Sequence, residues 1–437
     1  MKQEDSDNTA VLFLLDSELL GLCICLQQEN GRMRAALVIG IFCAGLAMSA
    51  GNLRADEHLS LVFVGDTGLN ASGARVSSEG GYKAGYLLSV DGSLEPMRPW
   101  LKADLVFANL ETVVTDNNMI ASRDKMFVFR MHPAGARALV SAGINVFSTA
   151  NNHAMDFGIA GAGETLKNME ALRGQGLLAW PGIGRSEREA LMPQLFSVGD
   201  TKIAISAFGI GGGGLPAREG NAGSLRGEEN FKQLTDELAQ APADLRILSV
   251  HYGMEFAPVV TTTEAARFEN LPDGIDIVVG HHAHVARGAA ITDGRLILYG
   301  LGNFLHFGTQ NMARFDICRD FGLLAKVGMM RATDGSMSLE TVEAVPLTNM
   351  HKQTRPMAGD AAKLRIAVLN YLGARLDDKA RGTQGLHFAT QPDGTGLWCA
   401  KGAVDPRCEG WILPPPTTGK ADEAIKSACA RNVRRGG

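Results

Sequence analysis

The sequence predicts an α/β fold in which buried strands alternate with helices. Short runs rich in Val, Ile, Leu and Phe recur along the chain and end in polar or glycine-rich residues, which is typical of buried strands. Patterns of helical periodicity lie between several of these runs. Of the 437 residues, 45% are hydrophobic and 20% are charged, so the chain can bury a large core. We therefore expect one large domain, or one domain with an appendage.

The expected elements can be placed in chain order. The predicted strands are 59–64, 104–108, 145–149, 202–208, 246–250, 275–279 and 295–299. The predicted helices between them are 133–142, 161–174 and 229–239. Two further strands, 323–330 and 338–345, flank the turn Thr333-Asp334-Gly335 and predict a hairpin that closes the domain.

Composition divides the chain into three segments. Residues 1–55 are expected to form a targeting segment, and residues 56–348 the main domain. Residues 349–437 are expected to hold one amphipathic helix, around 361–376, followed by a partly mobile tail rich in Gly, Pro and Lys.

The N-terminal part has the pattern of a signal peptide, at about residues 31–55. Gly31-Arg32-Met33-Arg34 precedes an uncharged, mostly apolar run, 35–50, and small residues follow it. The run is too short to span a bilayer comfortably, so we expect cleavage near residue 51 or 56 and no stable transmembrane anchor; a retained anchor is the alternative. Acidic residues before Gly31 favour Met33 over Met1 as the start of translation. A periplasmic or secreted, cell-envelope location follows.

Four cysteines remain after the predicted cleavage: Cys318, Cys399, Cys408 and Cys429. In an oxidising compartment, the short spacing from Cys399 to Cys408 predicts a local disulfide, although four cysteines allow three pairings.

Several classes of function are disfavoured. A net charge of −5 argues against a general nucleic-acid or anionic-membrane binder, which needs a basic surface. The glycines at 211–214 lack the Lys-Ser/Thr ending of a phosphate-binding loop, and no Gly-x-Ser-x-Gly elbow supports a serine nucleophile. Any anionic ligand must therefore be held by a local site.

Potential metal ligands follow nearly every predicted strand. In chain order they are Asp66, Asn109, Glu111, Asn151, Asn152, His153, His251, Glu255, His281, His282 and His284. In an α/β sheet, ligands bind beyond the carboxyl ends of the strands, so these side chains are expected to converge.

This mixture of residue types suits one or two ions of Mn, Zn or Fe better than Ca, which prefers oxygen alone. Two ions need a bridging carboxylate, for which Glu111 is our choice. His282 and His284 lie two apart after a buried strand, and in extended geometry both point to the same side, where His251 can join them. Bound ions make hydroxide available near neutral pH and polarise a phosphoryl or carbonyl oxygen.

Two residues are candidates for roles in catalysis. His153 is expected to give a proton to the leaving group or to bind the oxyanion. Arg130 is expected to hold an anionic substrate through a bidentate contact. Asp156, Glu255 and Asn303 are expected to orient the ligands or to be structural.

Each candidate has a simpler structural reading. Asp66 could be a helix cap, and Asn151 and Asn152 could be turn residues. His251 could be a buried structural histidine, and Arg130 an ordinary ion-paired residue. Three imidazoles within 281–284 are harder to explain by packing, and they favour a metal site.

Six ordered motifs resemble a known family. They are Val64-Gly65-Asp66, Asn109-Leu110-Glu111, Ala150-Asn151-Asn152-His153, His251-Tyr252-Gly253, Gly280-His281-His282-Ala283-His284-Val285 and Leu301-Gly302-Asn303-Phe304. Together, over roughly residues 58–348, they resemble the CapA (poly-γ-glutamate capsule synthesis) family, whose domain is similar to calcineurin-like metallophosphatases.

The resemblance implies a layered α-β-β-α sandwich of two mixed sheets flanked by helices. It implies that the metal ligands are Asp66, Glu111, Asn152, His251, His282 and His284, and that the residues supporting them are Asn109, Asp156, Glu255, His281 and Asn303. The sequence also departs from the pattern. The usual Asp-x-His of metallophosphatases reads Asp66-Thr67-Gly68, so one ligand of the first ion is missing.

Two functions follow from these observations. The first is a metal-dependent hydrolase or transferase, phosphoesterase-like, acting on a phosphoester or an anionic envelope polymer. The second is a non-catalytic binding or assembly component of a capsular polymer export machine, working with other envelope capsule-synthesis proteins. The histidines of the second half of the chain favour the first function, and the missing histidine at position 68 favours the second.

Overall fold

The computed structural model describes residues 24–29, 32–37, 57–210, 214–332 and 335–431 of a chain that divides into two units, Met1–Ala55 and Asp56–Gly437. In the first unit, β1 (Ile24–Glu29) pairs with β2 (Arg32–Leu37) in antiparallel fashion. Most of the predicted signal segment and both predicted cleavage positions fall in 38–56, outside the described residues. No helix in the described part of the chain is long and apolar enough to cross a membrane.

The second unit contains a mixed sheet of nine strands. Its main path runs β23 (Ala389–Thr390), β24 (Gly396–Cys399), β20 (Met337–Thr348), β19 (Gly322–Arg331), β3 (Glu57–Gly68), β6 (Leu105–Leu110) and β9 (Val146–Ser148). In addition, β18 (Asn303–His306) pairs with β3, and β21 (Arg355–Pro356) pairs with β20. The strands β18, β3, β6 and β9 are parallel, so their carboxyl ends share one edge.

A second mixed sheet has seven strands. Its order is β11 (Gln194–Val198), β12 (Thr201–Gly209), β14 (Leu245–His251), β15 (Ile277–His281), β17 (Arg295–Leu298), β16 (Ala289–Thr292) and β22 (Thr383–Gly385). The four strands from β12 to β17 are parallel. Three smaller two-stranded sheets are β4 (Gly81–Lys83) with β5 (Tyr86–Leu88), β7 (Val113–Val114) with β8 (Arg130–Met131), and β10 (Ile183–Gly184) with β13 (Gly223–Ser224).

The two large sheets pack face to face. Side chains alternate along a strand, so Leu61 and Phe63 of β3 point into a core shared with Ile247 of β14 and Val279 of β15. This close-packed apolar core fixes the two sheets against each other.

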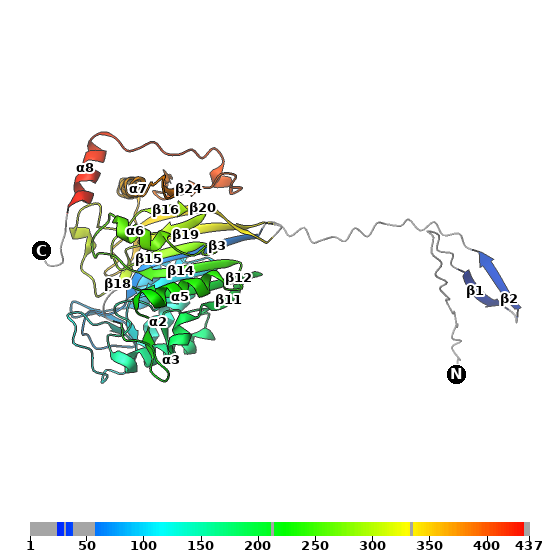
Figure 1. The fold of residues 1–437 in the computed structure, drawn as a ribbon, viewed down its shortest axis with the longest axis horizontal. Helices are drawn as coiled ribbons and strands as arrows, with labels where there is room; N and C mark the ends of the chain where they lie inside the picture. Colours follow the sequence, from blue (N-terminus) through cyan, green and yellow to red (C-terminus); the bar gives the residue numbers. More distant parts are fainter. Residues whose placement is uncertain (1–23, 30–31, 38–56, 211–213, 333–334, 432–437) are drawn as a thin grey trace. The chain divides into compact units, whose positions relative to one another are not determined.

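Helices cover the outer face of each sheet. On the first sheet, α2 (Pro133–Ser141) and α3 (Gly158–Arg173) pack against the residues that alternate with the inner set, such as Val62. On the second sheet, α5 (Gly227–Ala239) and α6 (Thr262–Glu269) pack against residues such as Leu248. The predicted α-β-β-α sandwich of two mixed sheets is therefore confirmed (Figure 1).

All the strands and helices predicted for the main domain are present, with ends that differ by a few residues. The predicted hairpin is the antiparallel pair β19 and β20. Short elements complete the domain: α1 (Val90–Leu94), α4 (Glu187–Leu191), and the 3-10 helices η1 (Glu95–Trp100), η2 (Met312–Arg314) and η3 (Pro406–Cys408).

The segment after residue 348 is part of the sandwich rather than a separate tail. It forms α7 (Gly359–Ala374), where a helix was expected, and α8 (Gly419–Ala430). Its strand β22 joins the second sheet, and β23 and β24 join the first. The strands of this segment, β21 to β24, were not predicted, because runs of two to four residues carry too little alternation to be recognised in the sequence.

Disulfides link Cys318 to Cys429 and Cys399 to Cys408, the second as predicted.

Candidate metal centre

Asp66 is aimed into the site by a bulge in β3. Val64 pairs with Ala108 and Asp66 with Asn109, so Gly65 is an extra residue in the strand. A side chain at position 65 would meet the carbonyl oxygen of Gly302 at 1.9 Å, so only glycine fits there. The bulge turns the Asp66 carboxylate to the carboxyl end of the sheet.

Glu111 lies at the centre of the site, directly after β6. Its side chain is fully buried, and within the described residues neither carboxylate oxygen has a hydrogen-bond partner. Imidazole nitrogens surround it instead. The distance to Oε1 is 3.5 Å from His251 Nε2 and 3.9 Å from His153 Nε2, and the distance to Oε2 is 3.6 Å from His306 Nε2. A buried carboxylate without donors is costly unless a cation binds it.

Two groups of ligands share Glu111. One group is Asp66, Glu111 and His284, and the other is Glu111, His251 and His282; in each, the ligand atoms lie within 4.8 Å of one another. Asn152 adds an oxygen to the second group, because its Oδ1 lies 2.9 Å from His251 Nε2. A carboxylate common to two groups is what the predicted bridging role requires.

The spacing of these atoms fits divalent ions. Two ligands bound at about 2.1 Å to one ion in tetrahedral geometry lie about 3.4 Å apart. The ring nitrogens lie 3.5 to 3.9 Å from the Glu111 oxygens, so small side-chain movements would complete the coordination. Carboxylate, carboxamide and imidazole together suit Mn, Zn or Fe.

The histidines after β15 reach the site by a different backbone path from the one predicted. The strand ends at His281, and His282 and His284 have φ values of 88° and 58°. The expectation of extended geometry is therefore wrong. Both residues occupy the left-handed region, which costs non-glycine residues about 1–3 kcal/mol each in strain and is characteristic of functional sites. The turn brings His282 Nδ1 to 3.1 Å from His251 Nε2.

His284 faces three oxygen atoms with one ring nitrogen. Its Nδ1 lies 2.9 Å from Asn303 Oδ1, 3.2 Å from Asp66 Oδ2 and 3.9 Å from Glu111 Oε2. Burial would lower the pKa of His284, but the charge of Glu111 and the contact with Asp66 raise it to about 9. A proton on this ring thus supplies positive charge at the position where a cation fits.

The remaining titratable groups respond to burial and to one another. Burial alone would raise the pKa of Asp66, but contacts with His281 and His284 hold it well below its usual range. Burial and the charge of Asp66 raise the pKa of Glu111. Burial and neighbouring imidazoles lower the pKa of His251, and that of His282 to about 4. Neutral imidazoles are the form that binds metal.

His153 faces the cluster with Nε2 while its other nitrogen is held. Nδ1 lies 2.7 Å from Asp156 Oδ2, and Asp156 also accepts hydrogen bonds from the Phe129 backbone N–H and from Lys125. Burial lowers the pKa of His153 despite Asp156, so the ring is neutral at neutral pH. With the Nδ1 proton directed to Asp156, Nε2 is left to accept a proton.

The other predicted residues fall into two sets. Asn109 Nδ2 donates to Asp66 Oδ1 at 2.8 Å and lies 3.2 Å from His251 Nδ1. It therefore links Asp66 of the first sheet to His251 of the second. His281 Nδ1 lies 3.5 Å from Asp66 Oδ1, and Glu255 acts on Glu111 through its charge. Asn109 and His281 therefore contact the cluster, as do Asp156 and Asn303.

Arg130 has its contacts elsewhere. Its guanidinium lies over the Phe157 ring, 4.7 Å from the centroid, and its Nε donates to the Ala74 carbonyl at 3.4 Å. No contact among the described residues joins it to the carboxylate and imidazole cluster. Another residue must therefore be considered for holding the substrate.

Two members of the site were not found from the sequence. His306 ends β18 after Phe304-Leu305, and the signal used for the other ligands, a polar residue closing an apolar run, was present. Lys125 donates to the Asn152 carbonyl at 2.7 Å and to Asp156, but it lies in a polar loop that offers no such signal.

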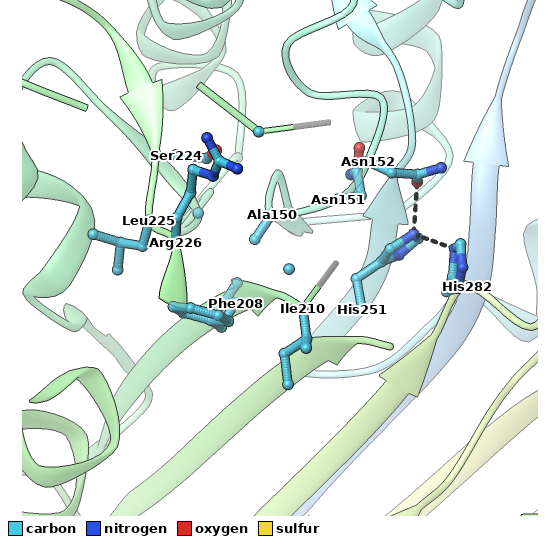
Figure 2. Close-up of a pocket in the computed structure, with 14 residues that line it drawn as sticks. Ala150, Asn151, Asn152, Phe208, Ile210, Ser224, Leu225, Arg226, His251 and His282 are labelled. Carbon is cyan, nitrogen blue, oxygen red and sulfur yellow. Dashed lines mark hydrogen bonds between the residues drawn. The ribbon is translucent and has the colours of Figure 1, made fainter. Parts of the chain in front are cut away.

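A cavity of about 200 Å³ opens on the second group of ligands. Figure 2 shows Asn152, His251 and His282 on one side and Arg226 with Ser224 on the other. Phe208 and Ile210 supply apolar surface between them. The cavity thus has metal-ligating side chains on one wall and a cation on the opposite wall.

Comparison with known proteins identifies the family. The sequence matches the family described as "Bacterial capsule synthesis protein PGA_cap" over residues 60–307, more than half of the chain. The chain belongs to this family. The resemblance to CapA proteins in the sequence is therefore confirmed, and the matched range contains every predicted ligand.

Relatives in the family are similar over part of their length. The "PGA biosynthesis protein CapA" of Bacillus subtilis (strain 168) is 29% identical over 255 residues, which are 57% of this chain and 64% of that protein. A "Probable polyglutamine synthesis accessory protein" of Mycobacterium tuberculosis is 32% identical over 213 residues, 46% of this chain and 55% of that protein. The chain thus spans less than two thirds of the length of these relatives.

Among solved structures, the NAD nucleotidase NadN of Haemophilus influenzae aligns with 70% of this chain and 61% of its own, at 13% identity and a TM-score of 0.38. A likeness at this level carries over no activity.

Proposed function

We propose that this protein is an exported capsule-synthesis protein of the poly-γ-glutamate type with a metal-dependent, phosphoesterase-like hydrolase site. Its substrate would be a phosphoester or an anionic envelope polymer. The observation that carries the proposal is Glu111, a fully buried carboxylate whose oxygens lack donors in the described chain and which is shared by two groups of metal ligands. The names of the relatives add the capsule and polyglutamate context.

The chain's own residues would bind and orient the substrate. Asp66, Glu111 and His284 would hold one divalent ion and Glu111, His251 and His282 another, and such ions would supply hydroxide near neutral pH and Lewis acidity. Arg226, across the cavity from His251 and His282, is better placed than Arg130 to hold an anionic group of the substrate (Figure 2). Phe208 would supply apolar surface beside this contact, and the Arg226 side chain itself is exposed.

His153 would handle the proton. An anionic substrate next to it raises its pKa, so Nε2 takes up a proton that it can then give to the leaving oxygen. Asp156 holds the ring in the orientation this transfer needs, at 2.7 Å from Nδ1. Lys125 in turn fixes Asp156.

Export is the second part of the proposal. The two disulfides support an oxidising compartment, the periplasm or the cell surface, because cytosolic thiols are kept reduced. In that compartment, other capsule-synthesis proteins of the envelope would be its partners.

Metal content is the first test of the proposal. We expect wild-type protein, purified without added metal and then loaded with Mn²⁺ or Zn²⁺, to retain the ion after desalting. His282→Ala and His284→Ala should each retain less, and His387→Ala, a matched change at a half-buried histidine outside the cluster, should equal wild type. Equal metal content in all four folded proteins would reject the site.

Substrate hydrolysis separates the two functions that the sequence suggested. Loaded wild type should release phosphate from aryl phosphate esters or shorten poly-γ-glutamate, and metal-free protein should do neither. Loaded protein that binds poly-γ-glutamate tightly but turns over no member of the panel would instead favour the assembly component.

A further inference from the structure

The two groups of ligands around Glu111 differ in completeness. The group with His251 and His282 also has the Asn152 oxygen. The group with Asp66 and His284 has no fourth ligand on β3, because position 68, where an Asp-x-His pattern places its histidine, is glycine. An ion bound by two carboxylates and one imidazole alone would be exposed to exchange.

The structure places the ring of His306 at this gap. Strand β18 runs parallel to β3, with His306 paired to Gly68. A Cβ atom added to Gly68 would lie 3.0 Å from both Cε1 and Nε2 of His306, and its three nearest neighbours are all atoms of that ring. The imidazole therefore occupies the space into which a side chain at position 68 would extend.

His306 also has the state expected of a ligand. It is fully buried, and neither ring nitrogen has a hydrogen-bond partner among the described residues. Its Nε2 lies 3.6 Å from Glu111 Oε2, the same oxygen that faces His284 Nδ1 at 3.9 Å. Packing alone does not account for an imidazole here, since its neighbour Phe129 would be served as well by an apolar ring.

We propose that His306 completes the first ion site, supplying from β18 the imidazole that Asp66-Thr67-Gly68 lacks. The ion would then be held by Asp66, Glu111, His284 and His306. Glycine at position 68 is part of this arrangement, because even a Cβ atom there would be in tight contact with the His306 ring, at 3.0 Å. The inference rests on the proposed metal centre.

Metal stoichiometry after loading tests this role without reference to activity. Wild type is expected to bind two ions per chain, and His306→Ala one, with the affinity for the lost ion reduced by more than about 100-fold. With Co²⁺, the visible absorption of the variant should lose the contribution of one site. His387→Ala is the control for a histidine change outside the cluster.

A second variant moves the ligand back to β3. Gly68 is not in the left-handed backbone region, so it can accept a side chain once the His306 ring is removed. The double variant Gly68→His, His306→Ala is expected to recover the second ion to within about tenfold of the wild-type affinity. Recovery also excludes misfolding as the cause of the loss in His306→Ala.

The outcomes are separable from those of the proposed function. Wild type that binds no ion rejects the metal centre as a whole. Wild type and His306→Ala that both bind two ions with equal affinity overturn the role of His306 alone. A folded double variant that binds no better than His306→Ala would contradict the placement of the ring at position 68.

Discussion

Replacing Glu111 by glutamine should have opposite effects on stability with and without metal. Glutamine keeps nearly the same volume but is neutral. In the metal-free protein, the Glu111 carboxylate is buried with no donor in the described chain, and an unpaired buried polar group costs about 1–3 kcal/mol. Glu111→Gln removes the negative charge, and its amide N–H can donate to an unprotonated ring nitrogen of His251 or His306, so the free energy of unfolding of the metal-free variant should rise by about that amount.

With metal bound, wild type should be more stable than Glu111→Gln. One ion at a free concentration of about 100 times its dissociation constant adds about 2.7 kcal/mol to the free energy of unfolding. Glu111 is shared by both ligand groups, so the variant should lose most of this gain for either ion. Wild type should therefore be the more stable protein when loaded.

Urea unfolding followed by circular dichroism, with EDTA and with Zn²⁺ or Mn²⁺, measures both effects. Glu264→Gln is a matched control, because Glu264 is also buried but is bound by Arg287 and the Thr261 backbone. That variant should lose stability equally in both conditions. The same loss for Glu111→Gln in both conditions would refute the reasoning.

The sign of the pH dependence follows from the raised pKa of Glu111. Below its ordinary value of 4.5 the group is protonated in folded and unfolded states, and the metal-free variant should gain nothing. As the pH rises through 4.5, only the unfolded chain ionises freely, and the folded wild type loses stability relative to the variant. If the stability gained by the variant is already at its full size below pH 4.5, the gain does not come from the Glu111 carboxylate.

Three further results are expected. His284 has a pKa of about 9 without metal, so a proton competes with the ion bound by Asp66, Glu111 and His284. Competition titrations should therefore show the affinity for this ion rising by up to about tenfold per pH unit as the pH approaches 9. An affinity that does not change with pH would contradict this. His153→Gln should lower kcat by about 10²- to 10⁴-fold on whichever ester the protein hydrolyses, and the metal content should not change. A variant that binds less metal than wild type would show that His153 is a metal ligand instead. Removing the Cys318–Cys429 disulfide, with a separation of 111 residues, should lower the free energy of unfolding by about 5 kcal/mol. Removing Cys399–Cys408, with a separation of 9 residues, should lower it by about 3 kcal/mol, and equal losses in urea unfolding would reject the loop-length argument.

The main domain could be predicted from sequence because its strands are long apolar runs. Runs such as Leu245–His251 and Ile277–His281 end in histidines of the candidate site, and parallel pairing brings those ends to one edge. The same rule identified Glu111, and the structure gives it the shared position expected of a bridging ligand.

The parts that sequence did not reveal depend on tertiary contacts. The left-handed turn at His282 and His284 is imposed by the loop and has no local signature. His306 closes an apolar run, so its local signal was present, but its position beside residue 68 depends on the pairing of β18 with β3, more than 200 positions earlier in the chain. The side-chain direction of Arg130, toward Phe157, was likewise not readable from its neighbours.

Anomalous diffraction from crystals grown with Mn²⁺ or Zn²⁺, measured at the absorption edge of the metal, tests the metal centre most directly. We predict two peaks beside the Glu111 carboxylate, one bounded by Asp66 and His284 and the other by His251 and His282. Anomalous density confined to surface positions, with none within bonding distance of Glu111 in a fully loaded crystal, would contradict the account.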